Sequence, residues 1–259
     1  MPESPEARLL LLHAGEEKEI HIFVHGYSAL SDEAALKTLL SYIARACPQG
    51  QVYLMYWQSG NWRAPAARSV ARLANWAMRG LQNSSFKPEE LLGELLQTAE
   101  HQIDQYTQSR DQAIATGKGL QQLLQDVPHV HEMPIHFIAH SLGARVIFEA
   151  LSKQDWSCYE LGDVIFLGGA VDARDGGWKA CAQKVRRIHN VWSKQDKALR
   201  LLPRGNHRIG RRELEIPQQE VNNTELRIGH TDYWPNLATI LPTVWPDFAP
   251  AAGLLSSEE

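Results

Sequence analysis

The sequence predicts an α/β fold in which a mostly parallel central sheet is flanked by helices. Short β-type runs at 20–24, 51–57 and 134–139 are separated by stretches with helical periodicity. Strands that are joined through helices pair in parallel, because the crossover returns the chain to the same end of the sheet. The length of 259 residues allows a sizeable core. We therefore expect residues 1–259 to form a single α/β domain.

The composition is that of an ordinary globular protein, and it disfavours nucleic acid as a partner. Apolar residues make up 44% and charged residues 22% of the chain, and the formal net charge is -4. General nucleic-acid binders usually carry a basic excess, which is absent here. The three cysteines are scattered and show no metal or redox spacing, so they fit a reducing compartment.

The first residues lack the features of a targeting or membrane segment. The apolar run Leu9–Leu12 is too short for a signal-peptide core or a membrane span. We expect a cytoplasmic protein without a membrane span, in which this run forms an edge strand.

A long polar stretch interrupts the alternation of strands and helices. Residues 62–126 are helical in pattern, with breaks near 83–88 and 117–119. One crossover helix needs far fewer residues, so part of the stretch is surplus to the sheet. We predict a helical insertion here, which either caps the site or packs as a hairpin on the outside of the fold.

A strand-turn-helix signal marks the centre of the chain. The run 134–139 ends in Ala139-His140-Ser141-Leu142-Gly143 and passes directly into a helical pattern. This arrangement is typical of a nucleophile elbow, in which the serine takes a strained conformation and small residues two positions away let strand and helix approach. The usual pattern has glycine at both small positions, and Ala139 departs from it. Ser141 is the predicted nucleophile; the alternative is an ordinary turn in which Ser141 caps the helix.

Candidate partners for Ser141 lie downstream in the sequence. His230 follows a glycine in a loop ahead of a helical pattern and is the predicted general base. Asp172 and Asp196 each come directly after a strand-like run, so each could deliver a carboxylate to the carboxyl edge of the sheet. A carboxylate there would hold the second ring nitrogen of the histidine in the productive tautomer. The residues alone leave both acids open.

The strand at 20–24 ends in His25-Gly26-Tyr27, where a glycine lets backbone amides point into the cleft at the carboxyl edge. Two such amides form an oxyanion hole when they face the developing negative oxygen. We assign them to Tyr27 and Leu142.

Two other groups of side chains are expected to have structural roles. The histidines near the elbow lack a further ligand at characteristic spacing, so no metal is expected; they are His129, His131, His136 and His140. A basic cluster after Asp196 could attract an anionic or phosphate-bearing substrate, although a solvated connection is the simpler interpretation. It comprises Arg200, Arg204, His207, Arg208, Arg211 and Arg212.

Taken together, these motifs resemble the α/β-hydrolase superfamily over most of the chain except the helical middle. They are His25-Gly26-Tyr27, Ala139 to Gly143, Asp196 and Gly229-His230. More narrowly, Phe23 to Tyr27, Tyr56 to Gly60 and Ala139 to Arg145 are similar to little-characterised bacterial serine hydrolases. The segment from Trp178 through Asp196 resembles the hydrolase domain of the transmembrane and coiled-coil-domain family, without its membrane spans. In this superfamily the acid most often follows the strand after the one that carries Asp172, so the resemblance implies Asp196.

The resemblance implies a serine hydrolase of the lipase or esterase type, which acts on a small-molecule acyl ester without a cofactor. Thioesterase or amidase action remains an alternative, because the same groups serve any acyl transfer. A non-catalytic binding protein of the same fold is a further alternative, since fold alone does not establish activity.

Overall fold

Seven strands form one sheet in the part of the chain that the structure describes. The structure is a computed structural model, and it describes residues 7–15, 18–26, 33–46, 48–59 and 104–248. The strands are β1 (Arg8–Ala14), β2 (Ile20–Val24), β3 (Gln51–Tyr56), β4 (Ile135–His140), β5 (Leu161–Leu167), β6 (Arg187–Trp192) and β7 (Val221–Glu225). Their order across the sheet is β1-β3-β2-β4-β5-β6-β7. Only the β1–β3 pair is antiparallel among these seven strands, which confirms the predicted mostly parallel α/β class.

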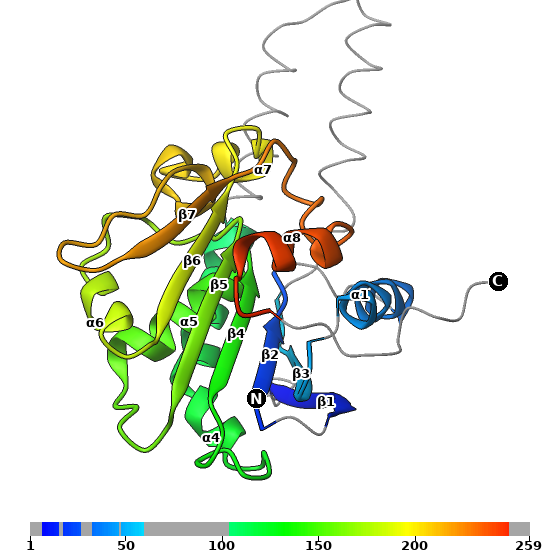
Figure 1. The fold of residues 1–259 in the computed structure, drawn as a ribbon. Helices are drawn as coiled ribbons and strands as arrows, with labels where there is room; N and C mark the ends of the chain where they lie inside the picture. The colour runs from blue at the N-terminus through cyan, green and yellow to red at the C-terminus, as the bar shows by residue number, and fades with distance from the viewer. Residues whose placement is uncertain (1–6, 16–17, 27–32, 47, 60–103, 249–259) are drawn as a thin grey trace, which may run out of the picture.

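Helices cover both faces of the sheet (Figure 1). In the described part of the chain they include α1 (Glu33–Arg45), α4 (Leu120–Leu124), α5 (Leu142–Lys153), α6 (Trp178–Ala182), α7 (Lys197–Leu201) and α8 (Leu237–Val244), with short 3-10 turns η1 (Gly205–His207) and η2 (Ile209–Arg211). Helices α1 and α8 share one apolar cluster with the sheet, and α4, α5 and α6 share the other. The two clusters explain why β2, β4 and β5 are buried along their whole length, since both faces of a parallel sheet are covered.

The strand register shows how alternate side chains serve the two layers. Phe23 of β2 is paired with Ile138 of β4, which in turn is paired with Ile165 of β5, and all three lie in the cluster beneath α1 and α8. Phe137 and Phe166, each next to one of these residues in sequence, belong to the opposite cluster. The period of two expected for strands therefore holds through the centre of the sheet.

The sequence predicts one edge strand of the sheet but not the other. The Leu9–Leu12 run lies in β1, which is an edge strand as predicted. Strand β7 at the other edge is a new finding, because its sequence Val-Asn-Asn-Thr-Glu lacks apolar alternation. Besides its backbone pairing with β6, one of its side chains ties it to its surroundings: the Asn223 Oδ1 accepts from Leu214 N–H at 2.8 Å and from Asn190 Nδ2 at 2.9 Å.

Only the last third of the predicted insertion lies in the described part of the chain. Residues 104–118 are helical, and α4 follows after a turn at Gly119. A Cβ on Gly117 would lie 2.5 Å from the Val146 carbonyl oxygen, so this helix packs closely on α5. Residues 62–103 lie outside the described ranges, and the cap stays a prediction.

Candidate active site

Ser141 lies in the sharp turn between β4 and α5, at the carboxyl edge of the sheet. Its backbone angles are φ 55° and ψ -119°, in a region that costs a non-glycine residue on the order of 1–3 kcal/mol. Neighbouring glycines make room for the turn. A Cβ on Gly26 would lie 2.6 Å from the Ser141 Cβ, and one on Gly143 would lie 2.4 Å from the Val24 carbonyl oxygen. The local geometry is therefore that of the predicted elbow.

Ala139 occupies the position where the usual pattern has glycine. It is fully buried and is paired in the sheet with Val24 on one side and Phe166 on the other. Its methyl group lies in the apolar cluster beneath α5. The sheet therefore accommodates alanine here without a break in pairing.

Three side chains that are distant in sequence form one chain of hydrogen bonds. The Ser141 Oγ lies 2.8 Å from the His230 Nε2, and the His230 Nδ1 lies 2.6 Å from the Asp196 Oδ2. Because a carboxylate only accepts, His230 donates from Nδ1 and its Nε2 is left to accept the serine proton. This is the arrangement in which the imidazole can act as a base toward the hydroxyl.

The carboxylate of Asp196 is fully buried and both of its oxygens are engaged. Oδ1 accepts the backbone N–H of Leu199 at 2.8 Å, so Asp196 also caps α7. The backbone carbonyl of Asp196 accepts from the Arg211 guanidinium. These contacts fix the carboxylate beside His230.

The loop that carries His230 is tied to the elbow and to the acid loop. His140 is buried, and its Nε2 lies 3.0 Å from the backbone carbonyl oxygen of His230. The centroids of the two imidazole rings are 4.8 Å apart. The Ser193 hydroxyl donates to the Ile228 carbonyl at 2.7 Å, and the Gly229 N–H donates to Asp232 at 2.7 Å.

The protonation state of His140 follows from this contact. Because a carbonyl oxygen only accepts, the His140 Nε2 carries a proton. Burial holds the pKa of His140 well below its usual value, and the nearby His230 lowers it further, so the ring is neutral. Sequence reasoning could not predict this contact, because His140 occupies the variable position of the elbow motif.

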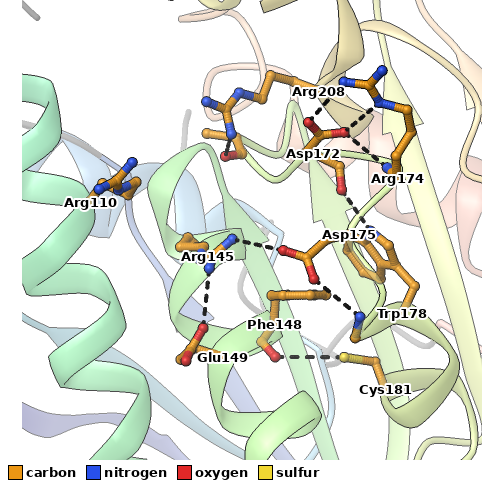
Figure 2. A network of polar contacts seen from close by, with 12 residues as sticks. Arg110, Arg145, Phe148, Glu149, Asp172, Arg174, Asp175, Trp178, Cys181 and Arg208 are labelled. Carbon is orange, nitrogen blue, oxygen red and sulfur yellow. Dashed lines mark hydrogen bonds and ion pairs between the residues drawn. The ribbon is translucent and has the colours of Figure 1, made fainter. Parts of the chain in front are cut away.

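Asp172 lies apart from His230 and has its own partner (Figure 2). Its carboxylate accepts the backbone N–H of Arg174 at 3.0 Å and the Arg174 guanidinium at 3.3 and 3.4 Å. The backbone carbonyl of Asp172 accepts the indole N–H of Trp178 at 2.9 Å. Of the two acids that the residues left open, Asp196 is the one that the structure brings to His230.

Of the two amides assigned to the oxyanion hole, only that of Leu142 lies in the described part of the chain. Leu142 is the first residue of α5, so its N–H has no acceptor within the helix. Tyr27 lies outside the described residues. Gly26, its neighbour, lies against Ser141, which brings this part of the chain to the same edge of the sheet.

The four histidines near the elbow have separate surroundings. His129 lies beside Glu132, His131 beside the Cys158 carbonyl, His136 accepts the Asp163 N–H, and His140 contacts the His230 carbonyl. Within the described ranges, no three His, Cys, Asp or Glu side chains come together as a metal would need. In these same ranges, no helix combines the length and the hydropathy that crossing a membrane requires.

Comparison with known proteins places the chain in a family. Residues 88–245 match the model described as "Protein of unknown function (DUF726)". The chain belongs to this family. No curated protein matches the DUF726 chain at a significant level.

Solved structures share the fold at low sequence identity. The DUF726 chain is similar to a variant of YbtT, described as the type II thioesterase of the yersiniabactin NRPS/PKS pathway, with a TM-score of 0.51 at 8% identity over 91% of this chain and 95% of that one. Esterase PE8 gives 0.45 at 13% identity over 92% and 99% of the two chains. A lipase-esterase related protein from Clostridium acetobutylicum gives 0.47 at 10% identity over 92% and 99%. The likeness to YbtT and the sheet order show an α/β-hydrolase fold.

Proposed function

We propose that this protein is a serine hydrolase that cleaves carboxylic esters through an acyl-enzyme. The observation that supports the proposal is the pair of hydrogen bonds that joins Ser141, His230 and Asp196, at 2.8 and 2.6 Å. Each of the three groups is held by further contacts, so the geometry is preorganised for proton transfer.

The first half of the reaction forms the acyl-enzyme. The Ser141 Oγ attacks the ester carbonyl carbon while its proton passes to the His230 Nε2, and the carbonyl π electrons move onto oxygen. The tetrahedral intermediate then collapses. The bond to the leaving oxygen breaks, and His230 returns the proton to that oxygen, so an alcohol leaves and the acyl group stays on Ser141.

The second half regenerates the enzyme. Water gives a proton to the His230 Nε2 as its oxygen attacks the acyl carbon, and collapse of the second intermediate breaks the bond to the Ser141 Oγ, which regains the proton. The carboxylate of Asp196 stabilises the imidazolium formed in both halves. Ester and water are consumed, and carboxylic acid and alcohol are produced.

The negative oxygen of each intermediate needs donors. In the proposed mechanism they are the backbone N–H groups of Leu142 and Tyr27. The Leu142 amide is suited to this because it has no helical acceptor and belongs to the positive end of α5.

A fluorophosphonate probe tests the proposal directly. We expect the probe to phosphonylate Ser141, with no labelling in Ser141→Ala and labelling at least about 100-fold slower in His230→Ala. Ser157→Ala and His129→Ala are matched controls, since both residues lie on the exposed surface away from the site, and they should label at the wild-type rate.

Two results would change the conclusion. A folded wild-type protein that neither labels nor hydrolyses 4-nitrophenyl esters would be a binding protein of this fold. Faster turnover of an acyl thioester or an anilide than of the matched ester would reassign the substrate class while keeping the same residues.

A further inference from the structure

A buried tyrosine hydroxyl lies in the electrostatic field of three arginines. Tyr106, in the helix at 104–118, is 6% exposed, and its hydroxyl has no hydrogen-bond partner in the described ranges. Burial raises the pKa of Tyr106, and the positive charges of Arg208, Arg110 and Arg145 act against that rise. A buried, unpaired hydroxyl in a positive field is suited to donate to an anion.

Arg208 is the most buried of these arginines, at 8% exposed. It donates to the backbone carbonyls of Ala170 at 3.1 Å and Pro203 at 3.0 Å, and its guanidinium carbon lies 5.9 Å from the Tyr106 ring centre. Its Nε has no partner, and no ion pair joins it to a carboxylate, within the part of the chain that the structure describes. Buried charges are normally paired, and the described residues offer no such partner to Arg208.

The acids nearby are held by other arginines (Figure 2). The pairs are Asp172 with Arg174, Asp175 and Glu149 with Arg145, and Asp111 with Arg110. The charge of Arg208 contributes to lowering the pKa of Asp172, but the ion pair of Asp172 is with Arg174. Arg145 keeps one buried donor, Nε, without a partner among the described residues. Donors therefore remain at Tyr106, Arg145 and Arg208 after the local acids are accounted for.

The backbone of Ala170 links this group to the turn that carries Ser141. The Ala170 carbonyl accepts from Arg208, and the Ala170 N–H donates to the Ser141 carbonyl at 2.9 Å. Arg145 lies four residues beyond Ser141 in α5, which corresponds to about 6 Å along the helix axis. A group bound here could belong to a substrate whose ester carbon lies at Ser141.

We propose that the Tyr106 hydroxyl and the Arg208 guanidinium, with Arg145 beside them, bind an anionic group of the substrate, either a carboxylate or a phosphate. Arginine suits both anions, because its planar donors match their oxygens. This inference rests on the proposed function and narrows it to esters that carry a negative charge away from the scissile bond.

The test compares two substrates of equal chain length. One is neutral 4-nitrophenyl hexanoate, and the other is the mono-4-nitrophenyl ester of adipic acid, which adds a terminal carboxylate. We expect kcat/KM for the adipate ester to exceed that for the hexanoate ester by about tenfold or more at low salt. The ratio should decrease in 0.5 M NaCl, where the Debye screening length is about 4 Å. A second arm measures competitive inhibition of hexanoate hydrolysis by inorganic phosphate.

Three variants decide which side chains are responsible. Tyr106→Phe removes only the hydroxyl and should lower the preference about tenfold, and Arg208→Gln should lower it at least as much. Arg174→Gln is the matched control, because it removes a neighbouring arginine that is bound to Asp172, and it should keep the preference. Tyr106→Phe keeps the inference testable if Arg208→Gln does not fold.

Each outcome has a defined meaning. A preference for adipate, or inhibition by phosphate, that falls in Tyr106→Phe and survives in Arg174→Gln supports the site and tells carboxylate from phosphate. Equal rates for both esters without phosphate inhibition would overturn the inference while leaving the hydrolase proposal intact. Absence of hydrolysis and of probe labelling would overturn the proposed function itself. A preference that Arg174→Gln lowers as much as Tyr106→Phe does would show a general charge effect and would also overturn the site.

Discussion

Replacing Asp196 by asparagine removes one charge and changes few atoms, yet the structure predicts a large loss of activity. The two carboxylate oxygens have different partners. Oδ1 accepts the Leu199 N–H at 2.8 Å, and Oδ2 accepts the His230 Nδ1–H at 2.6 Å. In Asp196→Asn only one position keeps an oxygen. The Leu199 N–H is a fixed buried donor, and facing it with an amide NH2 would cost about 1–3 kcal/mol, so the oxygen stays with Leu199.

The amide NH2 is then turned toward His230. A donor at this position forces the His230 Nδ1 to accept, which moves the ring proton to Nε2. In that tautomer the ring cannot take the proton of Ser141. The same tautomer change lowers kcat by roughly 10⁴ in serine proteases, and we expect a loss of about 10³–10⁴ here.

The assay is kcat for a 4-nitrophenyl ester, with thermal unfolding measured to show that each variant is folded. Asp172→Asn is the matched control, because the Asp172 carboxylate bonds to Arg174 and not to His230. Its activity should stay within about threefold of wild type, as for other surface ion pairs. Activity of Asp196→Asn within tenfold of wild type, or a greater loss in Asp172→Asn, would refute the reasoning.

Three further predictions concern positioning, packing and pH. His140→Phe keeps an aromatic ring but loses the hydrogen bond to the His230 carbonyl, so kcat should fall about tenfold with little change in KM; an unchanged kcat would contradict the positioning role. Gly143→Ala should lower the free energy of unfolding by about 1–3 kcal/mol, because the added Cβ would lie 2.4 Å from the Val24 carbonyl oxygen, whereas Gly176→Ala has open space and should change it by less than about 0.5 kcal/mol. Burial lowers the pKa of His25 and of His136 to about 4, and at His136 the charge of His21 lowers it further. Between about pH 6.5 and pH 4 the unfolded chain therefore binds more protons than the native state, so the free energy of unfolding should decrease as the pH is lowered through this window, by up to about 3 kcal/mol for each histidine. Equal free energies of unfolding in urea at pH 7 and pH 4.5 would show that these rings do not titrate as the structure predicts.

The elbow and the central strands could be predicted because their signals are local. Strand β4 is a continuous apolar run, Gly143 permits the close approach, and α5 follows at helical spacing. The partner of Ser141 was also predictable, since His230, which lies 2.8 Å from the Ser141 Oγ, follows a glycine in a loop after the last apolar strand of the sequence. Such features depend on residues that are close together in the chain, so a single sequence is enough to predict them.

What could not be predicted depends on contacts between distant segments. Asp172 and Asp196 follow strands in the same way, and only the placement of Arg174 beside one and His230 beside the other separates them. Strand β7 escaped prediction because its sequence lacks apolar alternation. Backbone pairing with β6 and the hydrogen bonds of Asn223 hold it in the sheet.

The basic cluster after Asp196 is also more ordered at one position than the sequence predicts. A solvated connection was the simpler expectation, but Arg208 is buried, and its guanidinium binds two backbone carbonyls. Nothing in the sequence distinguishes it from the exposed Arg212 four residues later in the same run, because burial depends on contacts with distant segments such as Ala170.

The central claim is that the acyl group passes through the Ser141 hydroxyl. Its most direct test is acid quenching during turnover of a 4-nitrophenyl ester, followed by mass spectrometry of the peptide that contains residues 135–145. The account predicts a peptide heavier by one acyl group at Ser141 within the first turnover, and no such adduct in Ser141→Ala. Hydrolysis that proceeds at the wild-type rate in Ser141→Ala, or an acyl group found on another residue, would contradict it.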